Sequence, residues 1–180
     1  MQQDFALRCS RKKRLPGGND GQAVVYWEKE RKWGSVNILI SMCLLGMRCR
    51  YDGKAGKQPE LLEQLRDHTL IPVCPEQLGG LPTPRLPSER QAERVVMCDG
   101  TDVTAQYRLG AEQALQLARR YCCTAAILKA KSPSCGSGRI YDGSFSRTLT
   151  DGWGITAELL RSNGIRVYDE TQIGQLLLDL

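Results

Sequence analysis

Three short apolar runs in this chain each lead to a cysteine, and this pattern limits the folds that the chain can adopt. The runs are VNILISM at 36–42, LIPV at 70–73 and AAIL at 125–128, and the cysteines that follow are Cys43, Cys74 and Cys135. Short runs rich in Val, Ile and Leu are typical of buried strands. The pattern therefore predicts three strands that each deliver a thiol at or just past the carboxyl end.

Helical patterns separate these apolar runs. Residues 59–68 open with a proline that suits a first helical turn, and residues 105–121 are rich in Ala, Leu and Gln. A helix after Gly152-Trp153-Gly154 should run through Arg161, followed by a fourth strand at 165–168 and a last helix near 171–178. Strands that alternate with helices predict an α/β fold with a parallel sheet and helices on both faces. In such sheets ligands bind beyond the carboxyl ends of the strands, where the three cysteines would converge.

The stretch CPEQLGGLPTPR, at residues 74–85, joins a thiol to the carboxylate of Glu76, two adjacent glycines, three prolines and Arg85. Because proline and glycine interrupt regular structure, we expect a stiff functional loop here rather than a helix or an ordinary strand. A short strand over 94–98 is possible after this loop.

Composition and charge favour one folded domain with a separate N-terminal segment. The 180 residues are 41% hydrophobic and 25% charged, and no apolar run approaches the roughly 20 residues of a membrane span. The net charge of +5 is uneven, because residues 1–35 hold 8 Lys and Arg against 4 Asp and Glu. We therefore expect residues 1–35 to be a basic, flexible extension, or else an arm for a nucleic acid or partner, and residues 36–180 to be one α/β domain.

Eight cysteines without a secretory signal pattern predict a reducing compartment, which we take to be the cytoplasm. Three thiols from three loops could form a zinc site, an iron–sulfur site or a redox-active trio. Structural zinc usually has four ligands, commonly in CxxC pairs, and the sequence contains no CxxC. Three thiolates on a cubane cluster would leave one iron open to a substrate. Cys49, in the same loop as Cys43, could replace it as a ligand or be a spare thiol.

Several polar side chains near these cysteines are candidates for acting on a substrate. Glu76 could move protons in a hydrolysis, or it could be a solvated loop carboxylate. Ser132 and Ser134 flank Pro133, and either hydroxyl could position water or substrate, or close a turn. The cations that could receive an anionic group such as phosphate, or be solvated at the surface, are Arg85, Lys129 and Lys131. The sequence has neither a Walker loop nor GxGxxG, which argues against a standard nucleotide or NAD site.

Four sequence blocks resemble the thiouracil desulfidase (TudS-type) family. In order along the chain they are CLLGMRCRYDG, VCPEQLGGLPTPR, DGTDVT and LKAKSPSCGSGRIYDG. The resemblance implies a Rossmann-like three-layer α/β sandwich with a mostly parallel sheet. It also implies a 4Fe-4S cluster whose ligands, matched block by block, are Cys43, Cys74 and Cys135.

The activity implied by the resemblance is removal of sulfur, as sulfide, from thiolated uracil bases or nucleotides such as thiouracil and 4-thio-UMP. The reaction would be a metal-assisted hydrolysis without net electron transfer. Glu76 matches the family's acid/base candidate, with Ser132 or Ser134 as its assistant, and Arg85 and Lys131 would bind the substrate. The expected partner is a small thiolated pyrimidine or nucleotide rather than a nucleic acid or a membrane.

Two other kinds of protein fit the same cysteines. One is a non-catalytic iron–sulfur sensor or binding module, and the other is a zinc-dependent hydrolase. A sensor needs only its ligands, so the presence of Glu76 and of the serine block favours chemistry. Metal analysis would separate the zinc enzyme from the two iron–sulfur proteins.

Overall fold

The computed structural model of the chain describes residues 35–56 and 58–180. The predicted extension at residues 1–35 lies outside this part of the chain except for Ser35, so its flexibility stays a prediction. Within the described residues, no helix combines the length and the apolar content needed to span a bilayer.

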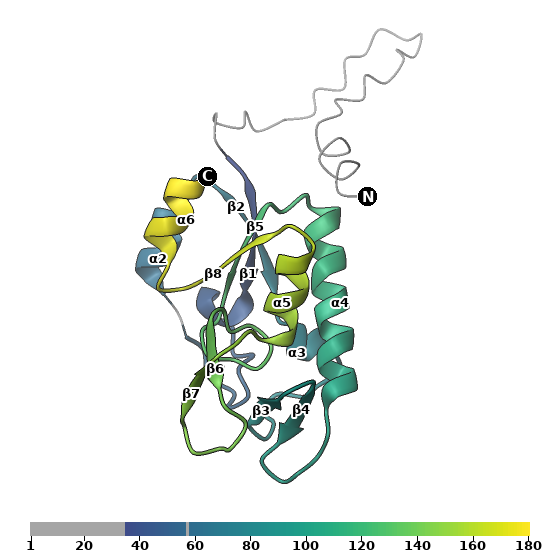
Figure 1. The fold of residues 1–180 in the computed structure, drawn as a ribbon. Helices are drawn as coiled ribbons and strands as arrows, with labels where there is room; N and C mark the ends of the chain where they lie inside the picture. The colour runs from purple at the N-terminus through teal and green to yellow at the C-terminus, as the bar shows by residue number, and fades with distance from the viewer. Residues whose placement is uncertain (1–34, 57) are drawn as a thin grey trace, which may run out of the picture. The chain divides into compact units, whose positions relative to one another are not determined.

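A sheet of four parallel strands forms the centre of the described domain (Figure 1). Its strand order is β2-β1-β5-β8, and Leu39 on β1 pairs with Ile71 on β2 and Ala126 on β5. Side chains on both faces of the inner strands are buried, which explains why their sequences are continuously apolar. The strands are β1 (Asn37–Ser41), β2 (Thr69–Val73), β5 (Ala125–Leu128) and β8 (Arg166–Asp169).

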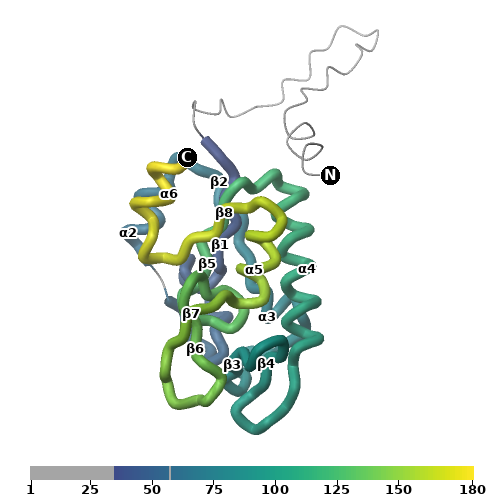
Figure 2. The backbone as a smooth tube through the Cα atoms, in the orientation of Figure 1, coloured from purple at the N-terminus to yellow at the C-terminus, as the bar shows by residue number. Residues whose placement is uncertain are grey.

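Helices cover both faces of this sheet, as predicted. Ile38 and Ile40 point to one face, where they pack with α2 and α6, and Leu39 points to the other, where it packs with α4 and α5. Figures 1 and 2 show the two helix pairs on opposite sides of the strands. The prediction of a three-layer α/β fold is confirmed. The helices are α2 (Pro59–Gln64), α4 (Thr104–Arg120), α5 (Ile155–Ser162) and α6 (Ile173–Asp179).

Two antiparallel hairpins lie beyond the carboxyl ends of the parallel strands (Figure 1). Only β4 falls on a predicted strand, and the other three strands of the hairpins were not predicted. Their segments, such as SERQ in β3, are short and polar, so they lack the apolar pattern on which a strand prediction depends. The hairpin strands are β3 (Ser88–Gln91), β4 (Arg94–Met97), β6 (Arg139–Tyr141) and β7 (Leu149–Asp151).

The expectation that residues 74–85 contain no helix is wrong, because Pro75–Leu78 form the single-turn helix α3. Proline is tolerated in the first helical turn, where its missing N–H group would have no intrahelical partner. Cys74 precedes the helix in an extended conformation, and Gly79 follows it. The helix therefore starts one residue after the cysteine and includes Glu76.

Candidate active site

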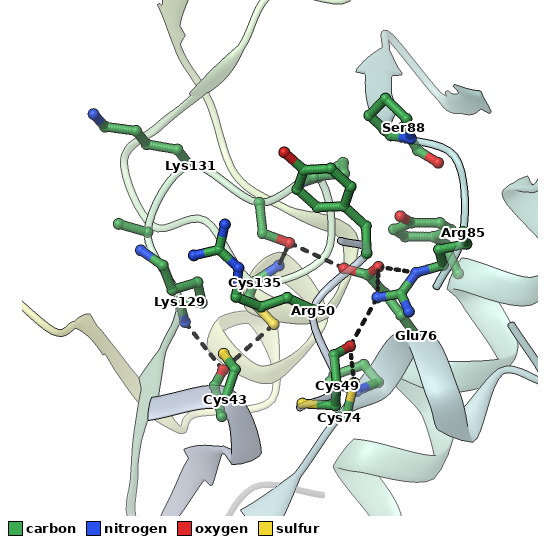
Figure 3. Close-up of a pocket in the computed structure, with 18 of the residues that line it drawn as sticks. Cys43, Cys49, Arg50, Cys74, Glu76, Arg85, Ser88, Lys129, Lys131 and Cys135 are labelled. Carbon is green, nitrogen blue, oxygen red and sulfur yellow. Dashed lines mark hydrogen bonds and ion pairs between the residues drawn. The ribbon is translucent and has the colours of Figure 1, made fainter. Parts of the chain in front are cut away.

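A cavity of about 470 Å³ opens at the carboxyl edge of the parallel sheet, where ligands bind in folds of this class. Its walls come from the ends of β1, β2 and β5 and from both hairpins, and Figure 3 shows many of the lining side chains. Segments that are far apart in the sequence therefore share one cavity. A volume of this size suits a small-molecule ligand.

Cys43, Cys74 and Cys135 all line this cavity. Cys43 lies on the 3-10 helix η1 (Met42–Leu45), which begins directly after β1, and Cys74 lies between β2 and α3. Cys135 lies in the loop that follows β5, and its sulfur accepts a hydrogen bond at 3.6 Å from the hydroxyl of Ser41, at the end of β1. The prediction that strand ends bring these three thiols together agrees with their placement in Figure 3.

A fourth thiol, that of Cys49, lies among them. It lines the same cavity, is buried, and forms hydrogen bonds with the thiols of Cys43 and Cys74. Its carbonyl oxygen accepts a hydrogen bond from the Cys74 sulfur at 3.8 Å and another from Arg85 at 3.2 Å. Cys49 is thus a neighbour of two of the predicted ligands.

The environment of these thiols favours their protonated forms. Burial, and then the nearby Glu76 carboxylate, raises the pKa of Cys135 to about 12. The hydrogen bond between the Cys49 and Cys43 thiols is the main cause that raises the pKa of Cys49 to about 11. The pKa of Cys74 is also raised, first by its hydrogen bond with Cys49 and then by burial. Metal binding would have to displace these protons, since thiolates are the ligands.

The three thiols suit a multinuclear cluster by their chemistry and placement. Within the described residues, no three side chains of His, Cys, Asp or Glu converge on a point that could hold one metal ion. Thiolates around one zinc ion, at about 2.3 Å each, would have to lie within about 4 Å of one another. An iron–sulfur cluster binds its thiolates at separate corners, so it fits cysteines that line one cavity without meeting at a point.

Glu76 is fixed on α3 by partners on both sides. Arg85 donates to its Oε2 from Nε at 2.8 Å and from Nη2, and Ser132 donates to its Oε1 at 3.3 Å. Figure 3 shows the Glu76 carboxylate beside the Arg85 guanidinium. The arrangement presents a carboxylate and a hydroxyl to the same cavity as the three thiols, which is what an acid/base pair requires.

The two serines that flank Pro133 have different surroundings. Ser132 lines the cavity, and its Oγ also accepts hydrogen bonds from the backbone N–H groups of Ser134 and Cys135 at 3.1 and 3.2 Å. Ser134 is fully buried, and its hydroxyl bonds to that of Thr156 on α5 at 2.9 Å. Ser132 therefore faces the cavity, whereas the Ser134 hydroxyl links the loop that contains Cys135 to α5.

The cations predicted to bind an anion also differ in their surroundings. The side chain of Arg85 is only 2% exposed, and its guanidinium is bonded to the Glu76 carboxylate and to the backbone oxygens of Cys49 and Pro82. Lys129 forms an ion pair with Glu170. Lys131 lines the cavity and is exposed, and no ion pair of its side chain is found within the described residues. Arg85 thus holds the site together, and Lys131 is the one with a side chain open to a ligand.

Several lining residues were not predicted from the sequence. Tyr107 on α4 is almost fully buried, and its pKa is raised by burial and then by the Glu76 carboxylate. Arg50 and Tyr51, after η1, also line the cavity. Those from the two hairpins are Ser88, Glu89, Tyr141, Phe145 and Arg147. No sequence pattern placed these hairpins beside the cysteines, because their position depends on packing between distant segments.

Comparisons with known proteins agree on one family. The model of the 2-thiouracil desulfurase family matches residues 38–172. The solved structure of a 4Fe-4S-dependent thiouracil desulfidase, TudS, superposes with a TM-score of 0.74 at 46% sequence identity, covering 81% of this chain and 97% of that one. The Bacillus subtilis (strain 168) protein YbbK, described as uncharacterized, is 39% identical over 150 residues, or 78% of this chain and 99% of its own length.

Proposed function

The chain belongs to the 2-thiouracil desulfurase family, and on that premise we propose that it is a 4Fe-4S-dependent enzyme that removes sulfur, as sulfide, from thiolated uracil compounds. The observation that carries this proposal is one cavity that contains the thiols of Cys43, Cys74 and Cys135 beside the Glu76 carboxylate and the Ser132 hydroxyl. The similar TudS protein, which is described as a 4Fe-4S-dependent thiouracil desulfidase, supports both the cofactor and the type of substrate.

The three cysteines would hold the cluster through their thiolates. When bound, a cluster with three protein ligands supplies an open iron, a Lewis acid with affinity for a thiocarbonyl sulfur. Cys49 lies next to Cys43 and Cys74, and we assign it a supporting role rather than that of a ligand. Because free thiols such as these three persist in a reducing compartment, we propose that the protein works in the cytoplasm.

The chain's own polar groups would carry out the proton transfers of a hydrolysis. The Glu76 carboxylate would take a proton from a water molecule that attacks the carbon bearing the sulfur. Ser132, whose hydroxyl donates to Glu76, would orient that water, and Arg85 would keep the carboxylate in place through its two hydrogen bonds. The reaction replaces C=S by C=O and releases sulfide, so it needs no oxidant or reductant.

The cavity also supports a substrate larger than the free base. Its volume of about 470 Å³ lies in the range of cavities that bind drug-sized ligands. Lys131 and Arg147, both exposed, line it, and within the described part of the chain neither side chain forms an ion pair. We propose that these two cations receive the phosphate of a thiolated nucleotide such as 4-thio-UMP.

An anaerobic reconstitution with iron and sulfide tests the proposal. The visible spectrum of the product is recorded, and the protein is then incubated with 2-thiouracil, 4-thiouracil and 4-thio-UMP while released sulfide is measured. A brown protein that consumes one of these compounds and releases sulfide would support the proposal. A brown but inert protein would favour a sensor, and a colourless protein that retains zinc would favour a zinc-dependent hydrolase.

Cysteine variants test the ligand assignment in the same preparation. Cys43→Ala, Cys74→Ala and Cys135→Ala should each lose the visible absorption of the cluster. Cys98→Ala is the matched control, because Cys98 is an exposed free thiol outside the cavity. Cys49→Ala should keep the absorption. If Cys49→Ala is colourless while Cys43→Ala stays brown, then Cys49 is the ligand and Cys43 is the neighbouring thiol.

A further inference from the structure

The loop between β6 and β7, residues 142–148, forms part of the cavity wall, and apart from Arg147 it has no role in the function proposed so far. It contributes Phe145 and Arg147 to the wall, and Tyr141 at the end of β6 adjoins it. Phe145 is half-buried, so part of its side chain is covered by protein and part is left open at the cavity. Phenylalanine offers a ligand only an apolar, aromatic surface.

Several residues that line this cavity have a strained, left-handed backbone conformation. Within the described residues, five non-glycine residues have a positive φ, and Lys131, Phe145 and Arg147 among them line the cavity, with φ of 64°, 59° and 65°. Bulky side chains rarely adopt this left-handed conformation. It persists only where the surrounding structure holds it in place, and it concentrates at sites where ligands bind. We therefore expect other parts of the structure to hold the backbone of Phe145 in this conformation.

The anchor is the buried carboxylate of Glu89 on β3. A single oxygen, Oε2, accepts hydrogen bonds from the backbone N–H groups of Gly143 and Phe145, both at 3.0 Å. Glu89 is 7% exposed, so these bonds are shielded from water. The carboxylate thus fixes the backbone of Phe145, a residue that lines the cavity.

Two further contacts fasten the same loop to β3. Gln91 donates from Nε2 to the Gly143 carbonyl oxygen at 2.7 Å. A Cβ atom at Gly143 would lie 2.9 Å from the Arg90 carbonyl oxygen and 2.7 Å from the Gln91 Cγ, so only glycine lets the loop approach the strand so closely.

Hydrogen bonds inside the loop add to its rigidity. The hydroxyls of Ser144 and Ser146 are 2.8 Å apart, and those of Ser146 and Thr148 are 2.7 Å apart. The Asp142 N–H group donates to the Thr148 carbonyl oxygen at 3.1 Å and closes the loop. These bonds add to the contacts that favour this loop conformation, and a loop ordered in advance lowers the entropy cost of binding.

We propose that Phe145 stacks against the pyrimidine ring of the substrate and that Glu89 is the positioning residue that keeps Phe145 in its binding conformation. This inference rests on the proposed function, since it assigns the residue that recognises the planar heterocycle. An aromatic ring is suited to this role because stacking acts on the face of a base and leaves its edge, with the reacting C=S group, open to other groups.

The test compares Phe145→Leu with Phe145→Trp in the reconstituted enzyme. Leucine keeps an apolar side chain but loses the aromatic face, and both variants must adopt the same positive φ. In Phe145→Leu, loss of stacking should raise both the KM for 2-thiouracil and the Kd for the product uracil by a factor between about 5 and about 150. The Kd for uracil is measured by calorimetry. Phe145→Trp, which keeps an aromatic face, should leave the KM for 2-thiouracil and the Kd for uracil close to those of the wild type. In both variants kcat at saturating substrate should change little. Equal KM and Kd values for the wild type and Phe145→Leu would overturn the role of Phe145.

Glu89→Ala and Glu89→Gln test the positioning role. Glutamine keeps one oxygen that can accept both backbone N–H groups, so it should retain most of the affinity, whereas alanine should raise KM as Phe145→Leu does. Melting curves and the visible spectrum show whether each variant folds and carries its cluster. If Glu89→Ala fails to fold, the Phe145 pair still decides the stacking role. A wild-type enzyme that is inactive on every thiouracil compound would refute the proposed function itself, whereas an active enzyme indifferent to Phe145→Leu would refute this inference alone.

Discussion

Glu76 has a position that no other carboxylate of the cavity shares. Its neighbour Arg85 is almost fully buried and bonds it twice, while Ser132 donates to its other oxygen from the loop that also contains Cys135. These partners come from two other segments of the chain, so the carboxylate is held in place without the thiols around it. A carboxylate fixed in this way can take a proton without moving.

Glu76→Gln should therefore keep the cluster and lose turnover. The amide has nearly the same shape, but it cannot accept a proton from water, and loss of a general base costs about 100-fold to 10,000-fold in kcat. The visible spectrum and sulfide release from the same sample check this prediction. Glu60→Gln is the control, because Glu60 is exposed on α2 and does not line the cavity. Full activity of Glu76→Gln would remove this residue from the mechanism.

Cys123 is a buried thiol that does not line the cavity, and it should affect the stability of the fold. It is fully buried in the core beneath α4 and α5, and burial raises its pKa from 9.0 to about 11. Above pH 9.0 the unfolded chain loses this proton while the folded chain keeps it until about pH 11. Unfolding then releases a proton, so the folded state loses stability as the pH rises, by about 1.4 kcal/mol per pH unit.

The contribution of Cys123 to the free energy of unfolding should therefore shrink across this window. Denaturant unfolding of the wild type and of Cys123→Ala, in reducing buffer from about pH 8 to about pH 10.5, measures it as a difference in which other titrating groups cancel. We expect the advantage of the wild type to fall by about 2 kcal/mol over this range. A difference that is constant with pH would show that Cys123 ionises as easily in the folded state as in the unfolded one.

At the scale of elements, the contact between α3 and α4 decides where Glu76 lies. Two glycines let the helices touch through their backbones. A Cβ atom at Gly110 would lie 1.9 Å from the Pro75 carbonyl oxygen, and one at Gly79 would lie 2.0 Å from the Gln106 carbonyl oxygen. Pro75 adjoins both Cys74 and Glu76, so this contact fixes the positions of the proposed cluster ligand and of the proposed acid/base residue together.

Gly110→Ala should consequently lower both stability and activity. An alanine inside a helix is normally favoured over glycine, but here the added methyl group must push α3 away, and overpacking of this kind costs about 1–3 kcal/mol. Gly174→Ala on α6 is the matched control, because nothing lies within 4 Å of its Cβ position and a stability gain of about 0.5–1 kcal/mol is expected. Thermal melting and sulfide release check both variants, and a stable, fully active Gly110→Ala would mean that α3 is not held by this contact.

The elements differ in how well the sequence predicts them. The parallel strands and the long helix α4 are predictable because burial on both faces, or a helical repeat, leaves a pattern in each segment by itself. Apart from β4, the hairpin strands are short and polar and leave no such pattern, and they contact segments distant in sequence, as β3 does with β6. The short helix α3 was missed for another reason, since the proline that interrupts most helices begins this one.

At the scale of the molecule, the site consists of a part that the sequence predicts and a part that depends on packing. Cys43, Cys74 and Cys135 could be found together because parallel strands end at one edge. The choice between Ser132 and Ser134 could not be made, since both flank the same proline and only the position of α5 buries one of them. The positions of Phe145 and Glu89 in the cavity depend on a contact between two hairpins that are about 50 residues apart in the sequence, as the bond between Glu89 and Gly143 shows. No local sequence pattern predicts such a contact.

The folded domain should suffice for the chemistry. The family match spans residues 38–172, and every residue that we place in the mechanism lies between Cys43 and Arg147. We therefore propose that a variant beginning at Ser35 melts within a few degrees of the full chain and desulfidates with the same kcat/KM, in keeping with a domain at residues 36–180. Loss of cluster binding or of activity in this variant would show that the N-terminal segment belongs to the site.

The same truncation separates catalysis from any role of the basic segment. Residues 1–34 contain 8 Lys and Arg and 4 Asp and Glu, so their removal takes the net charge from +5 to +1. If the segment attracts polyanions, the full chain should be retained on heparin at low salt and elute as salt rises, because screening weakens such contacts. The shortened chain should pass through the same column with its activity intact. Equal retention of both proteins would place the polyanion affinity on the folded domain, where Lys131 and Arg147 are the exposed cations of the cavity.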